Sequence, residues 1–398
     1  MSAALVCGGL AAVPAVPGAS GQSAVGARWQ TLPLKLRSYP PFTEPFSASG
    51  RTWFLVHREG AKTLLLSARL SGHTFRSFVK STLPETGPWT LLGSSFVYNP
   101  PSGDNRARIA PLLSGGRLGA AQHLPGDPEG KVLVLPTFKG GATVRAATRI
   151  AGRTIWFLTG GEADSFNGKS SIAVCCTAAG APVDLTHLLT NRRWAATDLH
   201  LGTDARGRLF AAWGDSKNNP SRDPKMIAHL LELDPSTLAV RSAKTLPTAS
   251  GSSYVTRAGA GFSLVLACAK TCRLVVWPLS GTYTWGPGER APTKIASRLK
   301  GILSAGWSAG RIAVSYYVTA RSGYVGSIVA ARGDRRGAHL QARSSVVPPV
   351  RLGSRGRPFS QSGPPQALLT PRGAIVVEGY DTYSGAARAL VAFLPLAR

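Results

Sequence analysis

Carboxyl and amide side chains gather in a few polar segments that follow apolar runs of the sequence. Residues 162–168 and 215–223 form two such segments, and a third lies at 378–381. Hydrolysis of a glycosidic bond needs two carboxyl groups at a set separation, one protonated and one ionised. Solvated loops are also polar by default, so loops without a ligand are the alternative interpretation. The candidate ligand-binding residues are Glu162, Asp164, Asn167, Asp215, Asn218, Arg222, Asp223, Glu378, Tyr380 and Asp381.

Metal and nucleophile chemistry has little support in the residue pattern. The segment 162–168 offers oxygen ligands and a glycine, as a small calcium loop does, but it lacks the acidic end of an EF-hand. The seven histidines show no metal-binding spacing, and no serine elbow motif occurs. We therefore expect no metal and no cofactor, and the sequence identifies no catalytic residue.

A second set of residues is cationic. Lys and Arg number 46 against 19 Asp and Glu, which gives a net charge of +27. Such a charge indicates either a compositional bias or adhesion to an anionic partner, such as nucleic acid, acidic polysaccharide or a membrane surface. No dedicated nucleic-acid motif is present. The residues expected to face an anionic partner are Arg51, Arg153, Arg208, Arg311, Arg335 and Arg336.

Four cysteines follow Cys7 in the sequence. Cys268 and Cys272 flank a short loop between two apolar runs, and a hairpin there would bring their sulfurs within reach of a disulfide. Cys175 and Cys176 are adjacent on an expected strand, whose alternation would send their side chains to opposite faces. We therefore expect two reduced, buried cysteines at 175 and 176, with a strained vicinal disulfide as the alternative.

The elements that position these residues follow a repeated rhythm, seen best in residues 194–247. Four short apolar stretches are separated there by turns at 205–207 and 235–237 and by a polar loop. This pattern predicts a four-stranded antiparallel meander. A glycine opens the second strand of several such units, at Gly50, Gly152, Gly207 and Gly310, where a tight turn needs a positive φ.

The period between these glycines is roughly 50 residues, which is in the range of β-propeller blades. We expect an all-β propeller of four-stranded antiparallel blades in a single domain, residues 28–398. Seven blades fit best, with six or eight as alternatives, at 41–84, 88–125, 131–190, 194–247, 251–297, 300–348 and 364–398. The last unit shows three strands, so the N-terminal strand at about 29–36 is expected to complete it and close the ring, which removes exposed edges.

In such a blade the strands are lettered a to d from the centre outward, and the connections sort into two ends. The b–c loops lie at one end, here called the b–c loop face, and contain most of the acidic candidates. The a–b and c–d turns lie at the other end, here called the turn face, and contain the Gly-Arg pairs. The turn face is therefore expected to be basic, and the b–c loop face mixed and more acidic.

The first 27 residues resemble a secretory signal. They are small and apolar, with small residues at Val25-Gly26-Ala27 where a signal peptidase would cleave, although no Lys or Arg precedes the apolar run. Pro14 and Pro17 argue against a membrane-spanning helix here, and no other segment is long and apolar enough for one. A secreted or cell-envelope protein is expected.

Residues 203–210, Thr-Asp-Ala-Arg-Gly-Arg-Leu-Phe, resemble the Asp-box turn of the sialidase-like superfamily of secreted bacterial β-propellers. The resemblance implies the propeller fold. Sialidases of that superfamily use an arginine trio, a tyrosine–glutamate pair and an aspartate acid. That catalytic set is not matched, because the nearest string to its Arg-Ile-Pro element is Arg108-Ile109-Ala110-Pro111.

Three functions remain open on the sequence. The first is a non-catalytic, monomeric binding or scaffolding propeller that recognises a glycan, a peptide or an anionic envelope polymer. The alternative is a glycan-active glycoside hydrolase that uses carboxylates of the b–c loop face. The third is a structural repeat domain without a ligand.

Overall fold

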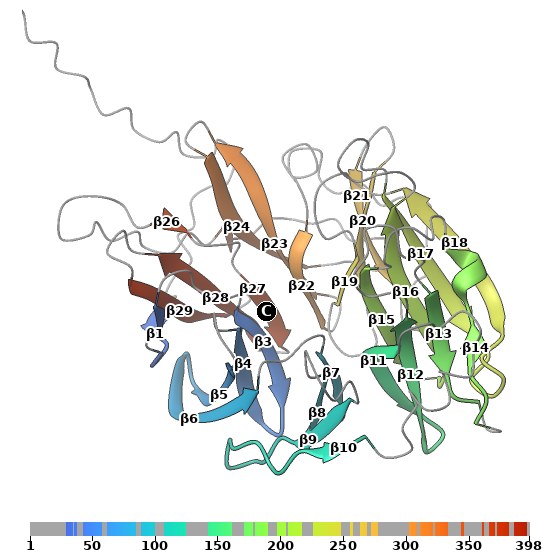
Figure 1. The fold of residues 1–398 in the computed structure, drawn as a ribbon. Coiled ribbons are helices and arrows are strands. Elements are labelled where there is room, and N and C mark those ends of the chain that lie inside the picture. Colours follow the sequence, from blue (N-terminus) through green and yellow to red (C-terminus); the bar gives the residue numbers. More distant parts are fainter. Residues whose placement is uncertain are drawn as a thin grey trace, which may run out of the picture.

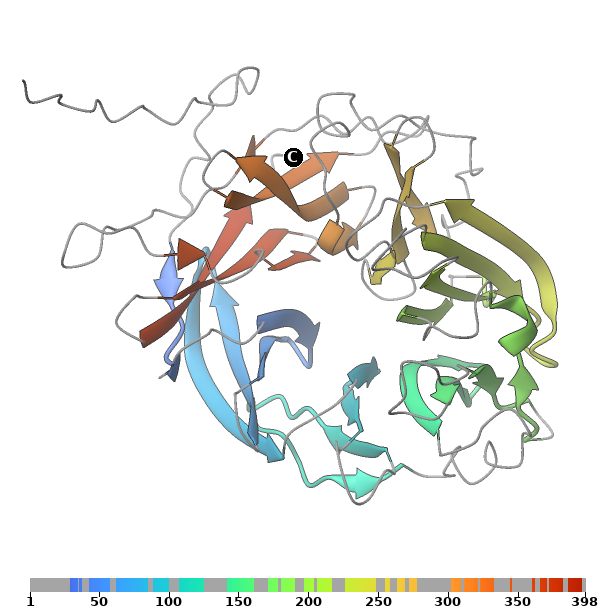
Figure 2. The same ribbon diagram turned by 45° about the horizontal axis from the view of Figure 1, so that its top comes forward.

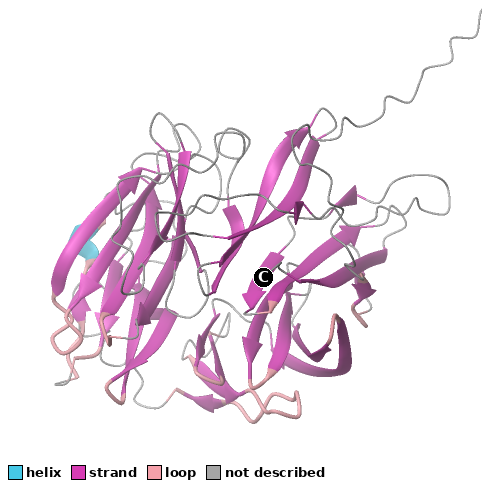
Figure 3. Ribbon diagram, turned by 180° about the vertical axis from the view of Figure 1, so that it is seen from behind, coloured by secondary structure: helices cyan, strands magenta, loops and turns pink. Residues whose placement is uncertain are grey.

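Short apolar runs joined by tight turns form antiparallel hairpins throughout this computed structural model. The structure describes residues 29–34, 36–37, 43–57, 62–84, 89–99, 107–124, 142–160, 171–177, 180–189, 197–203, 206–216, 226–247, 255–257, 263–268, 272–277, 302–308, 311–320, 323–332, 344–345, 360–361, 366–370, 372–381 and 386–395. Within these ranges the regular structure is strand, apart from one 3-10 turn, η1 (Thr186–Leu188) (Figure 3). The expected all-β class is confirmed.

The strands group into successive antiparallel sheets in chain order. The first contains β3 (Thr43–Ala48), β4 (Arg51–His57), β5 (Lys62–Ser71) and β6 (Thr74–Pro84). The second contains β7 (Trp89–Leu92), β8 (Ser95–Tyr98), β9 (Arg108–Pro111) and β10 (Gln122–His123). The third contains β11 (Ala142–Ile150), β12 (Arg153–Gly160), β13 (Ser171–Cys175) and β14 (Val183–Asp184).

Four further sheets follow. The fourth contains β15 (Thr197–Thr203), β16 (Leu209–Ser216), β17 (Met226–Leu233) and β18 (Val240–Pro247). The fifth contains β19 (Val255–Arg257), β20 (Ser263–Cys268) and β21 (Cys272–Trp277). The sixth contains β22 (Ile302–Ser308), β23 (Arg311–Ala320), β24 (Gly323–Arg332) and β25 (Ser344–Ser345).

The last sheet joins the two ends of the described chain. It contains β26 (Ser360–Gln361), β27 (Gln366–Thr370), β28 (Gly373–Asp381) and β29 (Ala386–Pro395). β1 (Gln30–Thr31) and β2 (Leu36–Arg37) both pair antiparallel with β29, opposite Val391 and Ala387 respectively. Residues near the start of the chain therefore form the outer part of its last sheet.

The expected turn chemistry is confirmed at several strand starts. Gly50, Gly152 and Gly207 have φ values of 69°, 74° and 72°. Ser49 and Ala151, which precede the first two glycines, are also left-handed, at 51° and 47°. Two consecutive positive φ values define the type I′ turn, whose twist matches that of paired strands.

The sheets lie side by side around a common centre (Figures 1 and 2), with the first strand of each of the first six sheets and β27 of the last sheet innermost. Inner strands of successive sheets contact one another: β7 with β11, β11 with β15, β15 with β19, β19 with β22, β22 with β27, and β27 with β3. Between the first two sheets, the rings of Phe46 and Trp89 lie 5.1 Å apart. This is the radial arrangement of a β-propeller.

The hydrophobic core lies between neighbouring sheets rather than on one side of a single sheet. One cluster joins Trp53 of the first sheet to Phe96 of the second, and another joins Phe157 of the third to Trp213 of the fourth. A further cluster joins the last sheet to the first through Phe393 and Phe54. Where burial is described, the sheets are covered on both faces, so their central strands are almost continuously apolar, as in the buried run of β13.

Among the described residues, no helix has both the length and the apolar character needed to cross a membrane.

Candidate functional site

The described turns gather at one end of the sheets, the turn face, drawn in pink in Figure 3. Of the arginines expected to make this end basic, Arg51 is 4% exposed. Its Nε donates to Ser67 Oγ at 3.1 Å and its Nη2 donates to the Ser77 carbonyl at 2.5 Å. The Ser67 hydroxyl donates in turn to the Gly116 carbonyl of the second sheet at 2.7 Å. Arg51 therefore joins two sheets and presents little of its surface to a partner.

No described carboxylate balances the charge of Arg51. Burial lowers the pKa of Arg51, and the positive charge of Arg69 lowers that pKa further. No carboxylate among the described side chains forms an ion pair with Arg51. A buried charge without a partner is costly, so an anion bound near Arg51 would be stabilised by electrostatic attraction.

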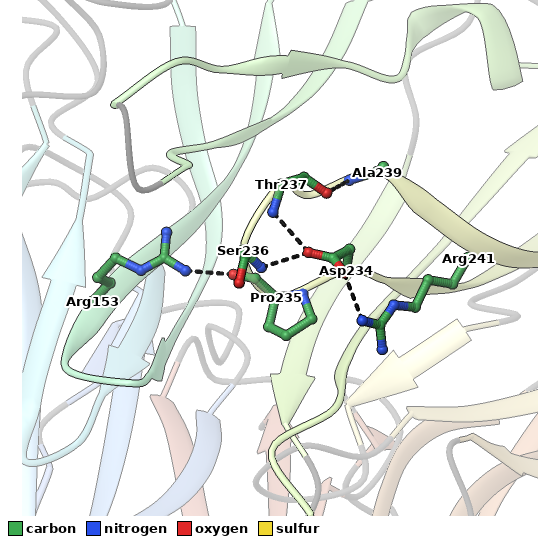
Figure 4. A network of polar contacts seen from close by, with 7 residues as sticks. All are labelled: Arg153, Asp234, Pro235, Ser236, Thr237, Ala239 and Arg241. Carbon is green, nitrogen blue, oxygen red and sulfur yellow. Dashed lines mark hydrogen bonds and ion pairs between the residues drawn. The ribbon is translucent and has the colours of Figure 1, made fainter.

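Arg153 connects the third sheet to the fourth at the same end. Its Nη2 donates to the Pro235 carbonyl in the β17–β18 turn at 2.5 Å (Figure 4). That turn is organised by Asp234, whose Oδ1 accepts from the backbone N–H groups of Ser236 and Thr237, each at 2.8 Å. Asp234 Oδ2 accepts from Arg241 Nη2 at 2.6 Å. The hydrogen bonds from Thr237, Ser236 and Arg241 hold the pKa of Asp234 well below its usual range.

Arg208 has a third environment. Its guanidinium lies 3.8 Å from the Glu232 carboxylate and 5.0 Å from the centroid of the Phe210 ring, and its side chain is 34% exposed. The cation is thus neutralised by a partner on β17 while its planar group faces an aromatic ring. Arg311 begins β23 opposite Arg332, but its side chain is outside the described part of the structure. Arg335 and Arg336 lie wholly outside the described residues.

Two cations that the turn pattern did not single out lie on the strands themselves. Arg69 of β5 and Arg76 of β6 are exposed and directly opposite each other in the strand register. The sequence could have predicted this pair, because Arg69 and Arg76 lie equally far from the turn at Gly72 and His73, and such residues face each other in a hairpin. The structure adds the placement of both beside Arg51, which no local pattern reveals.

On the b–c loop side, one acidic candidate has a described side chain. Asp215 is the last residue but one of β16 and has 0% exposure, and its Oδ1 lies 3.2 Å from His229 Nε2 on β17. The His229 ring stacks on Trp213 at a centroid distance of 4.8 Å and an interplanar angle of 7°. Asp215 is therefore part of the packing between sheets, and sequence reasoning missed His229 as its partner.

The other acidic candidates are described only in part or not at all. Glu378, Tyr380 and Asp381 lie in the second half of β28, opposite Leu390, Arg388 and Ala387, with their side chains outside the description. Six candidates fall in segments that the structure does not describe: Glu162, Asp164, Asn167, Asn218, Arg222 and Asp223.

The two cysteine pairs have different outcomes. The sulfurs of Cys175 and Cys176 form a disulfide, so the expectation of two reduced cysteines is wrong. β13 ends at Cys175, and the strand alternation that would separate the two side chains does not extend to Cys176. Cys268 and Cys272 lie directly opposite each other at the end of the β20–β21 hairpin, as expected. Their side chains are outside the described part of the structure, so the disulfide between them stays a prediction.

Among the described residues, no group of three or more His, Cys, Asp or Glu side chains is placed to hold a metal ion.

Comparison with known proteins gives no family. No protein-family model and no curated protein matches the chain. Among solved structures, the Myceliophteria thermophila Cps50 (Swd1) beta-propeller domain is 11% identical with a TM-score of 0.43, and the match covers 92% of this chain and 99% of that one. Chaetomium thermophilum Raptor is 12% identical with a TM-score of 0.43, and the match covers 92% of this chain and 29% of Raptor.

Bacillus subtilis arabinanase Arb43A is 11% identical with a TM-score of 0.30, and the match covers 92% of this chain and 95% of that one. With TM-scores below 0.5, these likenesses carry no information about activity or partners. The β-propeller arrangement of this chain follows from its own sheets and their order.

Proposed function

We propose that this chain is a closed seven-bladed propeller, completed by its N-terminal strand, that binds an anionic polymer or an anionic glycan without catalysing a reaction. The pairing of β1 and β2 with β29 supports the ring closure. The apolar, small-residue N-terminus supports a secreted or cell-envelope location, and the Asp-box-like turn at 203–210 supports a distant relationship to sialidase-like propellers.

The charge distribution of the first two sheets is the observation that carries this proposal. Their described side chains include no carboxylate. Among the described side chains of these sheets, the exposed charges are all cationic, at Lys62, Arg69, Arg76, Lys80 and Arg117. A surface whose charges are all positive attracts negatively charged polymers, and added salt weakens this attraction.

The environment of Asp215 supports binding over catalysis. A carboxylate that hydrolyses a glycosidic bond must reach the substrate, either as an acid or as a nucleophile. Asp215 has 0% exposure and lies against His229, so it cannot contact a glycan in this conformation. A hydrolase would therefore depend on the remaining acidic candidates, Glu162, Asp164, Asp223, Glu378 and Asp381.

Binding to immobilised polymers tests the proposal directly. The purified chain is applied to surfaces that display polyphosphate, dextran sulfate or poly-glutamate, with neutral dextran as the matched control. We expect binding to anionic surfaces alone and a steep loss of affinity as NaCl rises from about 50 to 500 mM, since the Debye length shortens from roughly 14 to 4 Å over that range. Binding that ignores salt, or equal binding to neutral dextran, would contradict the proposal.

The hydrolase alternative has its own assay. The same protein is incubated with a panel of polysaccharides, and newly formed reducing ends are measured. We expect no release above the buffer control. Release that is lost in Glu378→Gln or Asp381→Asn would overturn the non-catalytic proposal.

A further inference from the structure

Four arginines border the junction between the first and second sheets at the turn face. Trp53 of β4 packs with Phe96 of the second sheet, so this face of β4 is turned toward that sheet. Arg51 lies two residues before Trp53 and shares its face, because side chains alternate along a strand. On β5, Ser67 reaches the second sheet through its hydroxyl, and Arg69 lies two residues further on the same face.

Arg76 completes the group on the first sheet. It lies directly opposite Arg69 in the β5–β6 pairing, and residues opposite each other in a ladder project from the same face. The ladder is irregular between Ser67 and Arg69, and Ser77 of β6 has a φ of 53° there. The Ser77 carbonyl is the acceptor of the Arg51 Nη2 hydrogen bond, so the irregularity holds Arg51 beside the exposed pair.

The second sheet contributes the far side of the group. Gly116 packs so closely on Arg51 that an added Cβ would lie 2.6 Å from Arg51 Nε. Leu118 N–H donates to Ser81 Oγ of β6 at 3.0 Å. The exposed Arg117 therefore lies between two residues that contact the first sheet.

This arrangement is unfavourable without a counterion. Like charges directly opposite each other on a sheet are destabilising, and Arg69 and Arg76 are in that position. Arg51 adds a third positive charge from a buried position, and its pKa is lowered first by that burial and further by the charge of Arg69. No described carboxylate of either sheet offsets these charges. Neighbouring guanidinium groups match tetrahedral oxyanions well, because each can donate two parallel N–H bonds to two oxygens of one group.

We propose that Arg69 and Arg76, with Arg117 at the edge, form a binding site for a tetrahedral oxyanion, the phosphate or sulfate group of an anionic polymer. Arg51 strengthens the local positive charge without contacting the ligand. The inference rests on the proposed polymer-binding function and assigns it a place and a ligand chemistry. A tetrahedral group presents oxygens in more directions than a planar carboxylate does, so both opposed guanidinium groups can donate to it.

The test compares small anions on matched variants at constant ionic strength. Isothermal titration of the full chain uses inorganic phosphate, sulfate and acetate as ligands. The variants are Arg69→Gln, Arg76→Gln and the double substitution, with Arg372→Gln as the control, because Arg372 is an exposed arginine of the same turn face on the last sheet. All three positions are exposed, so the variants are expected to fold, which circular dichroism verifies.

We expect phosphate and sulfate to bind more tightly than acetate. The double variant should weaken phosphate binding about tenfold or more, each single variant less, and Arg372→Gln should leave it unchanged. Equal loss in the control would show a general charge effect and overturn the site. Unchanged phosphate affinity in the double variant, or a failure of the wild-type chain to bind phosphate and sulfate, would overturn it as well.

Polymer binding separates this inference from the proposed function. If the wild-type chain binds inorganic phosphate through the arginine pair but binds no polymer, the site stands and the polymer-binding function fails. If the double variant keeps full affinity for polyphosphate and dextran sulfate, the polymer-binding function stands and the site is wrong. Polyphosphate bound more tightly than inorganic phosphate would identify the polymer, rather than the free ion, as the source of the phosphate group.

Discussion

Asp215 shows how burial changes the role of a residue that the sequence marks for chemistry. Its carboxylate and the His229 imidazole lie 3.2 Å apart between the third and fourth sheets, next to the buried Trp213 ring. Trp213 contacts Phe157 edge to face at 5.7 Å, so the polar pair lies at the margin of the apolar core. Removing one partner of a buried pair leaves the other without compensation.

We therefore expect Asp215→Ala to lower the free energy of unfolding by about 3 kcal/mol, the cost typical of breaking a buried polar pair. Urea denaturation followed by tryptophan fluorescence measures this loss. Asp215→Asn keeps an oxygen acceptor for His229 and should lose clearly less. Equal stability of Asp215→Ala and the wild type would show that the pair contributes nothing to the packing.

The β17–β18 turn is the element whose stability depends on ionisation. Asp234 caps this turn through two backbone N–H groups and one arginine, while Arg153 of the neighbouring sheet donates to the same turn at Pro235 (Figure 4). The pKa of Asp234 is lower in the folded chain than its usual value of about 3.9. Its contribution to stability is therefore fully present above the usual pKa and is lost as the pH falls toward the folded pKa.

Asp234→Ala is expected to lower Tm at pH 7, and the difference from the wild type should shrink as the pH is lowered below about 4. Thermal unfolding at a series of pH values measures both effects. Arg241→Gln is the matched control, because it removes the exposed ion pair but keeps both backbone hydrogen bonds, and exposed ion pairs contribute little. A difference in Tm that stays constant down to pH 2 would contradict a role of the ionised carboxylate.

In the described part of the chain, the side-chain amides of Gln30 and Asn99 connect neighbouring sheets. The Gln30 amide accepts from the Phe75 N–H at 2.6 Å and donates to the Phe75 carbonyl at 3.1 Å, which joins the last sheet to the first. Asn99 makes the same two bonds to Val144, at 3.3 and 2.8 Å, between the second and third sheets. No described strand ladder connects neighbouring sheets, so each amide side chain supplies one pair of hydrogen bonds to the backbone of the next sheet.

Gln30→Ala is expected to destabilise the whole molecule by about 1–3 kcal/mol, because the backbone groups of the buried Phe75 lose their partners. Chemical denaturation measures the change, and Thr31→Ala, at the exposed neighbour on the same strand, is the control.

If the N-terminal strand closes the ring, deletion of residues 1–37 should lower Tm far more than deletion of residues 1–28. Equal Tm values for the two deletions would refute closure by this strand.

The sequence by itself determined the all-β class, the approximate limits of the four-stranded units and the glycines of the a–b turns. These features depend on neighbours in the chain: alternation and apolar runs define strands, and Gly50, Gly152 and Gly207 have the positive φ that tight hairpins need. The pairing of residues 30–31 and 36–37 with the last strand was also predictable, because the final unit lacked a strand.

The tertiary structure alone decided what the charged residues do. Arg51, Arg153 and Arg208 share one sequence pattern, yet one is buried against a serine, one bonds the next sheet and one pairs with Glu232. Likewise, Asp215 lies against His229 rather than in an open site, and Arg69 and Arg76 lie beside Arg51. Solvation and charge at each position depend on which sheet packs beside it, and that neighbour is set by the arrangement of all the sheets rather than by the local sequence.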